Sequence, residues 1–310
     1  MAAATFLMST WNAGPWIRPA IESVLAQTEP DWRMVVVDDC SSDGTPDVVE
    51  SYEDDRISVV RAEVNAGQTA ALNRGLELIE TPWVARLDQD DLAAPQRLER
   101  QLAFVGEHPG TVGVGAWASL IDEDDNLLEV FRPPTEPAAV KRDFYARPEA
   151  NPIAHSSMLF DAALARELGG YPSQLAIAQD YGLWVQLAAR GEVANVPDVL
   201  TSIRQHGGQA SGSRKGLVRQ LREMIEVSSG LADLFGLEGE ERRAWNRARL
   251  RLVAHRAVAN GNGKDWPALG RDTRELVAEG VRDPAVFADT GRVLMNGVRH
   301  RVRSVRGAEG

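Results

Sequence analysis

The chain has 310 residues, of which 44% are hydrophobic and 25% are charged, a composition that excludes a disordered, collagen-like or coiled-coil protein. Its single cysteine, Cys40, excludes a disulfide framework and a cysteine-rich zinc site. No stretch approaches the ~20 apolar residues of a membrane span, and the beginning lacks the basic residues of a signal peptide, so we expect a cytoplasmic protein.

The net charge of −11 is distributed unevenly along the chain. Residues 1–212 carry 15 basic and 32 acidic side chains, a net charge of −17, whereas residues 213–310 carry 19 basic and 13 acidic ones, a net charge of +6. This asymmetry predicts two domains with different tasks, 1–212 and 213–310. We expect no nucleic acid as partner, because the larger part is acidic and few aromatic residues accompany the basic ones.

Short apolar runs alternate with amphipathic stretches in the first part of the chain. The runs predict strands at 4–8, 34–37, 57–61 and 83–87, and the stretches between them predict helices from Pro15, from about Pro46 and at 68–79. This alternation is typical of a largely parallel sheet covered by helices.

The later elements are less regular. A helix is predicted at 95–107, a hairpin at 112–121 and 127–131, a helix at 178–187 and a strand at 199–203. The acidic hairpin turn at 122–125 is interpreted as a solvated turn rather than a metal site. After residue 212, long helices are predicted at 217–235, 240–259, 266–279 and 284–305.

Polar side chains collect where the predicted strands end. In open α/β sheets, ligands bind at the carboxyl ends of the strands, so these side chains are expected to converge on one edge. They are Thr10, Asn12, Asp38, Asp39, Asn65, Asp88, Asp90 and Asp91.

Three carboxylates, Asp88, Asp90 and Asp91, directly follow an apolar strand, and the nearby lysine and arginine residues cannot neutralise all three. Mg2+ or Mn2+ is the natural partner of such a cluster, together with phosphate oxygens. An acidic turn preceding the helix at Pro95 is the structural alternative, and the pattern alone leaves both open.

The pair Asp38 and Asp39 offers acceptors for a base N–H or ribose hydroxyls. A helix cap or an Asx turn is the alternative. Asp43 can serve as that cap, which would leave the pair free. No glycine-rich dinucleotide motif or P-loop is present.

Three further residues have both a structural and a functional interpretation. Asp180 lies in the first turn of a predicted helix, where a carboxylate is favourable even without a function, but it could also be a general base. His155 and His206 are each either structural residues or ligands. No serine–histidine–aspartate arrangement indicates a hydrolase.

Taken in order, these motifs resemble those of the family 2 glycosyltransferases with the GT-A fold, over roughly residues 4–211. The matching segments are STWN at 9–12, SVLAQT at 23–28, VVDDCSSDGT at 36–45, NAG at 65–67, ALNRG at 71–75, LDQDD at 87–91, HSS at 155–157, QDY at 179–181, LW at 183–184, and Arg204 with His206. The resemblance implies a Rossmann-like, mostly parallel central sheet flanked by helices, followed here by a C-terminal α-helical extension.

The resemblance also implies roles for individual residues. Thr10, Asn12, Asp39, Asn65 and Asp88 would bind the nucleotide. Asp88 and Asp90 would form a D-x-D pair that holds Mn2+ or Mg2+, with His206 as a further metal ligand or diphosphate contact. Asp180 would be the catalytic base. This chain departs from the usual pattern at two positions, with Gln179 in place of Glu and Gly182 in place of Asp.

The implied activity is inverting, metal-dependent transfer of a hexosyl group from a nucleoside-diphosphate sugar, most simply a UDP-sugar, to an acceptor hydroxyl. The acceptor would be a saccharide, a lipid-linked saccharide or a small molecule, in polysaccharide or glycoconjugate synthesis. The alternatives are a non-catalytic nucleotide-sugar-binding module and a sugar-phosphate nucleotidylyltransferase.

A basic amphipathic helix is predicted near the C-terminus. Val298, Val302 and Val305 share one face, and three arginines follow the same spacing on another. Such a helix could contact anionic lipid at the inner face of the membrane or simply face solvent.

Overall fold

The computed structural model describes residues 2–209, 213–262 and 265–280. Contacts within the chain define two compact units, 1–141 with 151–207, and 142–150 with 208–310. The second unit therefore includes a short segment from the middle of the chain, which the predicted division at residue 212 did not include. Within that unit, the segment is attached to the long helix that follows it, since Tyr145 donates a hydrogen bond to Glu241 at 3.1 Å.

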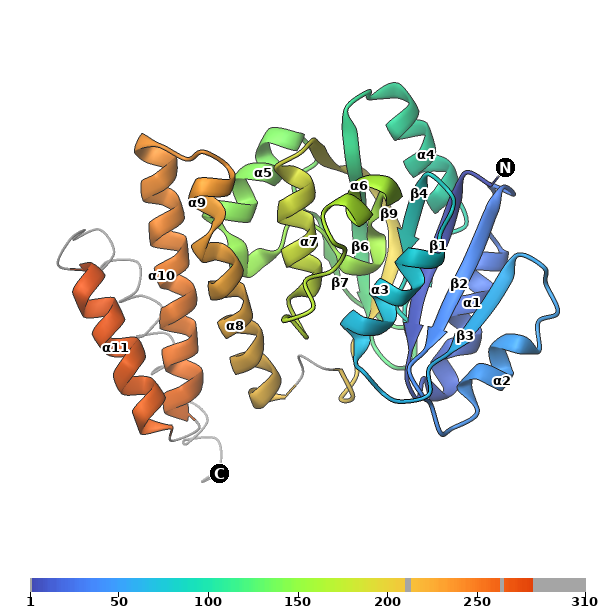
Figure 1. The fold of residues 1–310 in the computed structure, drawn as a ribbon, viewed down its shortest axis with the longest axis horizontal. Helices are drawn as coiled ribbons and strands as arrows, with labels where there is room; N and C mark the ends of the chain where they lie inside the picture. The colour runs from blue at the N-terminus through green and yellow to red at the C-terminus, as the bar shows by residue number, and fades with distance from the viewer. Residues whose placement is uncertain (1, 210–212, 263–264, 281–310) are drawn as a thin grey trace. The chain divides into compact units, whose positions relative to one another are not determined.

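A nine-stranded sheet forms the centre of the first unit within the described residues (Figure 1). The strand order is β3-β2-β1-β4-β8-β6-β9-β5, and β7 pairs with β6. The strands are β1 (Ala4–Thr10), β2 (Trp32–Asp38), β3 (Ile57–Arg61), β4 (Trp83–Arg86), β5 (Leu92–Ala93), β6 (Thr111–Ile121), β7 (Leu127–Phe131), β8 (Leu159–Asp161) and β9 (Glu192–Arg204).

The first four strands are parallel, as predicted, and they lie side by side in the order β3-β2-β1-β4. Beyond β4 the sheet is mixed, because β8 runs antiparallel to both β4 and β6, while β6 and β9 are parallel to each other. The β6–β7 hairpin is antiparallel, also as predicted. The parallel half therefore brings the carboxyl ends of β1, β2 and β4 to one edge of the sheet.

Helices connect the strands and cover the sheet. In this unit and the segment that follows β7 they are α1 (Ile17–Leu25), α2 (Thr45–Glu50), α3 (Gln68–Leu78), α4 (Arg97–Glu107), α5 (Pro137–Ala146), α6 (Ala162–Glu167) and α7 (Gln179–Ala188), with the short 3-10 helices η1 (Gly14–Trp16), η2 (Pro148–Ala150) and η3 (His155–Ser157).

One face of the sheet is buried against α1. Phe6 and Met34 on the strands and Ile21 and Val24 on the helix are all fully buried in the same hydrophobic cluster. The two helix residues are three positions apart and so lie on the same face of α1. Apolar patterning of this kind is the signal from which the strand–helix alternation was predicted.

Helix α3 covers the opposite face of the sheet (Figure 1). Successive side chains of a strand point to opposite faces, so Leu7 of β1 points away from the face that its neighbour Phe6 shares with α1. Gly75 of α3 lies so close to the sheet that a Cβ there would meet the side chains of Leu7 and Val37. This close approach fixes α3 on the sheet and places its first residue, Gln68, near the carboxyl edge of the parallel strands.

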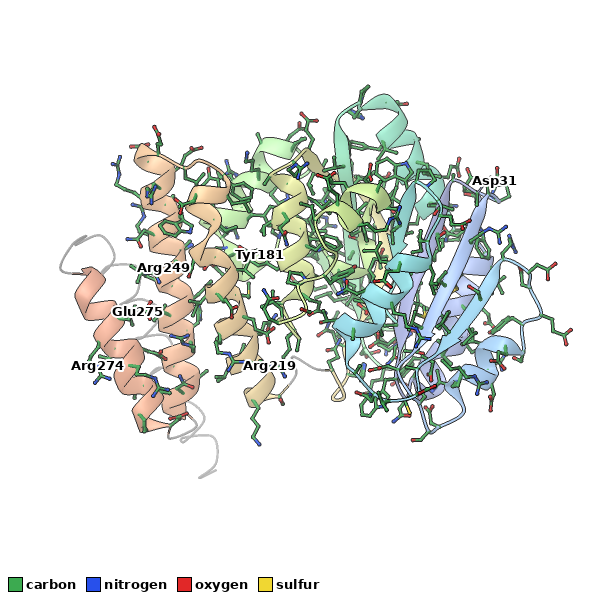
Figure 2. All side chains as sticks on the ribbon, viewed as in Figure 1. Asp31, Tyr181, Arg219, Arg249, Arg274 and Glu275 are labelled. Atoms are coloured by element: carbon green, nitrogen blue, oxygen red, sulfur yellow. The ribbon has the colours of Figure 1, made fainter. Side chains whose placement is uncertain are left out.

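The second unit is helical. Its helices after residue 208 are α8 (Arg214–Ser229), α9 (Leu231–Leu234), α10 (Gly239–Asn262) and α11 (Trp266–Gly280), so the predicted helix at 217–235 is interrupted at Gly230. Arg249 of α10 and Glu275 of α11 point toward one another (Figure 2) and form an ion pair at 2.8 Å. The helix predicted at 284–305 lies outside the described residues.

Among the residues that the structure describes, no helix has the length and apolar character needed to cross a membrane.

Candidate active site

The ends of β1 and β2 are joined by side-chain hydrogen bonds. Thr10 and Asp38 are partners in the parallel register, and the Thr10 hydroxyl donates to Oδ1 of Asp38 at 3.2 Å. Two residues on, Asn12 has a φ of 47° and accepts the backbone N–H of Ser42 at 2.8 Å. The structure thus brings Thr10, Asn12 and Asp38 together, as expected from their positions at strand ends.

Asp39 connects the end of β2 to the turn that precedes α3. Its two carboxylate oxygens accept the backbone N–H groups of Ala66 and Gly67, at 2.8 and 2.7 Å, and its side chain is buried. Asn65 directly precedes these two donors and is exposed. The sequence places Asn65 and Asp39 far apart, and these hydrogen bonds bring the segment that contains Asn65 to the end of β2.

The expectation that Asp38 and Asp39 are left free was wrong, because both carboxylates accept backbone N–H groups. Asp38 accepts the N–H of Ser41 at 3.0 Å, and Asp39 holds the turn before α3. Asp43 does accept the N–H of Thr45, the first residue of α2, at 3.1 Å, although the N-cap position itself is Gly44, and it also accepts the N–H of Gly14 at 2.9 Å. These loops need internal acceptors because their backbone N–H groups have no strand partners.

Asp88 is surrounded by hydrogen-bond donors from three segments of the chain. Oδ1 accepts from Nε2 of Gln68 at 3.0 Å and from Arg86, and Oδ2 accepts from the Ser156 hydroxyl at 3.0 Å. Nδ1 of His155 lies 3.3 Å from Oδ2. Burial by itself raises the pKa of Asp88, but the Arg86 charge, His155 and the Ser156 hydrogen bond lower it well below the usual carboxyl range.

Asp90 and His206 face each other at the end of β9. Nε2 of His206 lies 2.8 Å from Oδ2 of Asp90, and each of the two side chains is 17% exposed to solvent. Asp91 is more deeply buried and accepts the backbone N–H of Arg204 at 2.9 Å. The antiparallel pairing of β5 with β9 explains this proximity, since β5 directly follows the three aspartates.

Burial and the charge of Asp88 both raise the pKa of Asp90, while His206 acts in the opposite direction. Burial and the charges of Asp90 and Asp88 raise the pKa of Asp91 further. The negative charge of Asp90 is unfavourable in this surrounding, and its side chain is still partly exposed. A bound cation would stabilise that charge.

The described residues hold no group of three or more histidine, cysteine, aspartate or glutamate side chains arranged around a common metal position. Asp90 and His206 nevertheless offer an oxygen and an imidazole nitrogen side by side, a donor set that fits Mn2+ or Mg2+ with phosphate oxygens and water completing the shell. Asp88 fits less well as a ligand, because protein donors already occupy both of its oxygens.

Asp180 lies in the first turn of α7. Its Oδ2 accepts a hydrogen bond from Nδ2 of Asn151 at 3.0 Å. Burial raises the pKa of Asp180, and the charge of Asp88 adds to this effect, while His155, the Tyr181 N–H and Asn151 oppose it. A carboxyl group with a raised pKa is closer to the range required of a general base at neutral pH.

The sequence analysis assigned no role to several residues of this site. Arg86 and Arg204 are buried charges that follow strand-like runs, where a charged residue is an unusual signal. Trp11 is 54% exposed beside Gln89, to which its backbone N–H donates at 2.8 Å. Gln68 carried no local signal, because its partner Asp88 is distant in the sequence.

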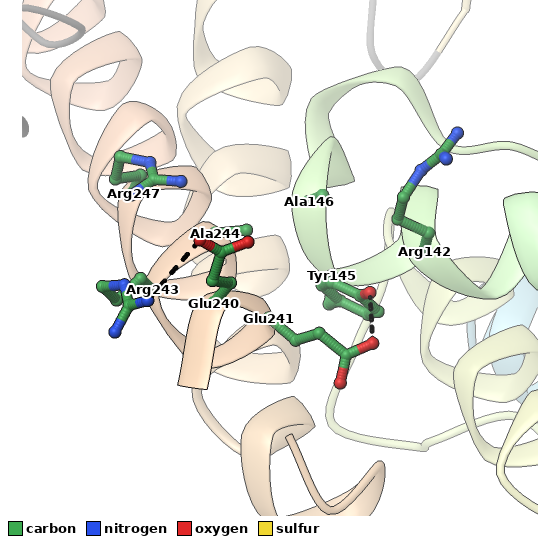
Figure 3. Close-up of a pocket in the computed structure, with 8 residues that line it drawn as sticks. All are labelled: Arg142, Tyr145, Ala146, Glu240, Glu241, Arg243, Ala244 and Arg247. Carbon is green, nitrogen blue, oxygen red and sulfur yellow. Dashed lines mark hydrogen bonds and ion pairs between the residues drawn. The ribbon is translucent and has the colours of Figure 1, made fainter. Parts of the chain in front are cut away.

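A separate pocket of about 340 Å3 lies in the helical unit, and Figure 3 shows the residues that line it. Three of them are arginines and two are glutamates. Glu241 accepts from the Tyr145 hydroxyl at 3.1 Å, and Glu240 pairs with Arg243 at 3.8 Å. Because its charges are largely balanced, this pocket lacks the acidic character of the sheet edge.

Comparison with protein families assigns the chain. Residues 5–167, more than half of its length, match the family model described as glycosyl transferase family 2. The chain belongs to this family, as the ordered motifs predicted.

Curated relatives carry the names of polysaccharide-synthesis proteins. The succinoglycan biosynthesis protein ExoO of Rhizobium meliloti is 28% identical over 253 residues, which cover 78% of this chain and 72% of ExoO. The glycosyltransferase TuaG of Bacillus subtilis, named for teichuronic acid biosynthesis, is 40% identical over 124 residues, or 39% of this chain. The match spans 49% of TuaG, about half of that relative's length.

Solved structures show the same fold. Residues 1–349 of Staphylococcus aureus TarS, in complex with UDP-GlcNAc, align with a TM-score of 0.62 at 18% identity over 92% of both chains. The mannosyltransferase PcManGT from Pyrobaculum calidifontis, in complex with GDP-Man and Mn2+, aligns with a TM-score of 0.61 at 19% identity over 97% of this chain and 87% of that one. The predicted GT-A fold followed by C-terminal helices is therefore confirmed.

Proposed function

We propose that this chain is an inverting glycosyltransferase that moves a sugar from a nucleoside-diphosphate sugar to an acceptor hydroxyl in polysaccharide or glycoconjugate synthesis. One observation carries the proposal: Asp180 lies at the start of α7, and its neighbour Gln179 is hydrogen-bonded through Gln68 to Asp88 at the carboxyl edge of the sheet. A base and a donor-binding carboxylate close to each other are what a single-displacement transfer requires.

In this reaction Asp180 accepts the proton of the acceptor hydroxyl. The hydroxyl oxygen then attacks the anomeric carbon on the face opposite the diphosphate, so the configuration inverts and no covalent enzyme intermediate forms. Asn151 orients the Asp180 carboxylate by donating a hydrogen bond to its Oδ2. General base catalysis of this kind contributes roughly 10²- to 10⁴-fold to the rate.

Thr10, Asn12, Asp39, Asn65 and Asp88 form the proposed nucleotide site. Their convergence at the ends of β1, β2 and β4 supports it, as does the position of ligands at the carboxyl edge of such sheets. The solved relatives carry either UDP-GlcNAc or GDP-Man. We favour a UDP-sugar as donor here.

The proposed metal ligands are Asp90 and His206, with Asp88 as the neighbouring member of the D-x-D pair. A bound Mn2+ or Mg2+ would supply positive charge to the diphosphate leaving group. PcManGT was solved with Mn2+, which supports this choice.

A non-catalytic nucleotide-sugar-binding module is the alternative. It requires no base, so it would tolerate changes at Asp180. A sugar-phosphate nucleotidylyltransferase is less consistent with the loop at 9–14, which contains no lysine or arginine.

The test is Asp180→Asn, which keeps the shape and the Asn151 contact but removes the base. We expect the dissociation constant for UDP to change less than twofold while sugar transfer falls at least 10²-fold. The control is Asp198→Asn, on the exposed part of β9. Asp161→Asn would not serve, because the Asp161 side chain caps α6. Turnover of Asp180→Asn at the wild-type rate would exclude this residue as the base.

We also propose contact with anionic membrane surfaces through the basic helix predicted near residues 298–306, which lies outside the described residues. Removal of 296–310 should then reduce binding to anionic liposomes. Unchanged binding would refute this part of the proposal.

A further inference from the structure

Two glutamine side chains and Asp88 form a continuous hydrogen-bonded chain. Nε2 of Gln179 donates to Oε1 of Gln68 at 2.9 Å, and Nε2 of Gln68 donates to Oδ1 of Asp88 at 3.0 Å. Gln68 is the first residue of α3, and Gln179 is the first residue of α7. This series of hydrogen bonds therefore connects the helix that carries Asp180 to the strand end that carries Asp88.

The direction of this chain is fixed by its last member. Asp88 pairs with the guanidinium of Arg86 and accepts the Ser156 hydroxyl, and a carboxylate in such an ion pair can only accept hydrogen bonds. Gln68 must therefore turn its NH2 group toward Asp88 and its oxygen toward Gln179. Gln179 must donate in turn, which leaves its own Oε1 buried without a partner among the described residues.

Of the two glutamines in this series of hydrogen bonds, Gln68 is the one that a ligand can reach. Its side chain is exposed, whereas Gln179 is only 2% exposed. The NH2 group of Gln68 has two hydrogens, and Asp88 accepts one of them. In the part of the chain that the structure describes, the second N–H has no protein acceptor.

The proposed reaction places a sugar next to this N–H. The anomeric carbon has to lie between the departing diphosphate, near Asp88 and Asp90, and the acceptor hydroxyl, near Asp180. Gln68 bridges these same two ends through its bonds to Asp88 and to the first residue of α7.

We propose that Gln68 is a specificity-determining residue whose free amide N–H donates a hydrogen bond to a hydroxyl oxygen of the donor's sugar ring. The inference rests on the proposed function and adds the residue that contacts the sugar. Asp88 and Gln179 hold the amide from both sides, so its orientation is set before the ligand arrives, which lowers the entropy cost of binding.

The proposal also gives a physical reason for glutamine at position 179. A glutamate there has no hydrogen to donate to Oε1 of Gln68. Gln68 would then be drawn to two carboxylates, and its second N–H would turn toward residue 179 and away from the sugar. The amide of Gln179 is thus a positioning group for Gln68.

The experiment compares binding of UDP with binding of UDP-glucose, UDP-N-acetylglucosamine and GDP-mannose to the full chain by calorimetry, with Mn2+ present. The variants are Gln68→Met, Gln179→Glu and the double variant. Gln186→Met is the matched control, because Gln186 also lies on α7 but its amide donates to the carbonyl of Gly182 in the same helix.

We expect the best-bound nucleotide sugar to lose about tenfold in affinity in Gln68→Met and in Gln179→Glu, while UDP changes less than twofold. The double variant should lose no more than either single one, because both changes remove the same contact. Equal losses for UDP and the nucleotide sugar, no loss at all, or additive losses would overturn the proposal. Absence of nucleotide binding by the wild type would instead refute the proposed function on which it rests.

Discussion

The Nε–H of Arg86 donates a hydrogen bond to Nε2 of His155 at 3.1 Å. A guanidinium can only donate, so His155 accepts at Nε2 and carries its proton on Nδ1, which lies 3.3 Å from Oδ2 of Asp88. Arg86 therefore acts on Asp88 twice, by direct contact through its Nη2 and by fixing the tautomer of His155. Asp88 is held in one position before any ligand binds.

Arg86→Met should destabilise the protein by about 3–5 kcal/mol at pH 7, because it leaves Asp88 partly buried without its charge partner. Arg86 is fully buried, so water cannot replace it. Arg86 lowers the pKa of Asp88, and a lowered pKa stabilises the fold at pH values above the unfolded pKa. The loss should therefore shrink as the pH falls toward 4, where protonation of Asp88 removes the unpaired charge. Urea unfolding at several pH values measures it.

The matched control is Arg190→Met. Arg190 and Glu167 form an ion pair at 2.6 Å, but both side chains are about half exposed. Pairs of this kind contribute about 0–1 kcal/mol. A loss in Arg86→Met no larger than that of the control would show that the buried arginine is not needed to compensate Asp88.

Mn2+ should raise the melting temperature more at pH 8 than at pH 5. Burial and Asp88 raise the pKa of Asp90, so its ionised form destabilises the fold. The stability associated with this raised pKa is present at low pH and is lost as the pH rises through the folded-state value. A cation restores it at high pH, whereas at low pH it must first displace a proton.

Differential scanning fluorimetry with and without Mn2+ tests this dependence. Asp90→Asn should abolish the stabilisation by Mn2+, and Asp124→Asn, in the exposed turn of the β6–β7 hairpin, should leave it unchanged. A Mn2+ effect that is the same at both pH values, or that persists in Asp90→Asn, would contradict the assignment of Asp90 to the metal.

The parallel half of the fold could be predicted from the sequence because each strand there is a short, largely apolar run. The strand predicted at 57–61 coincides with β3. The second half was harder, since β9 extends over Glu192–Arg204 while only 199–203 was predicted. Its first half pairs with β6 across register shifts, so no simple alternation is visible. The three residues of β8 became a strand only through pairing with β4 and β6.

The acidic residues of the site could be predicted because strand ends carry them to one edge. Their partners could not. Ser156 and Gln68 contact Asp88 from 68 and 20 positions away in the sequence, and neither residue type has a local signal for such a contact. The single-residue patterns left Asp180 ambiguous, and the order of the motifs was needed to interpret it as a base.

Gly67→Ala should destabilise the protein by about 1–3 kcal/mol. Gly67 has φ 90° and ψ 159°, a backbone conformation that is essentially restricted to glycine. Its N–H donates to Asp39 at 2.7 Å, so relaxation of the strained backbone would also break the contact that joins β2 to α3. We therefore expect weaker UDP binding in this variant as well, measured by calorimetry alongside urea unfolding.

Gly106→Ala is the matched control for Gly67→Ala. Gly106 lies in α4, and a Cβ there meets no other atom within 4 Å. Alanine is favoured over glycine in a helix by roughly 0.5–1 kcal/mol, so this variant should be more stable than the wild type, with unchanged UDP binding. The two substitutions add the same methyl group and should have opposite signs, because one backbone is helical and the other is not. If Gly67→Ala were also stabilising, the turn before α3 would not require glycine and would not fix Asp39 as described.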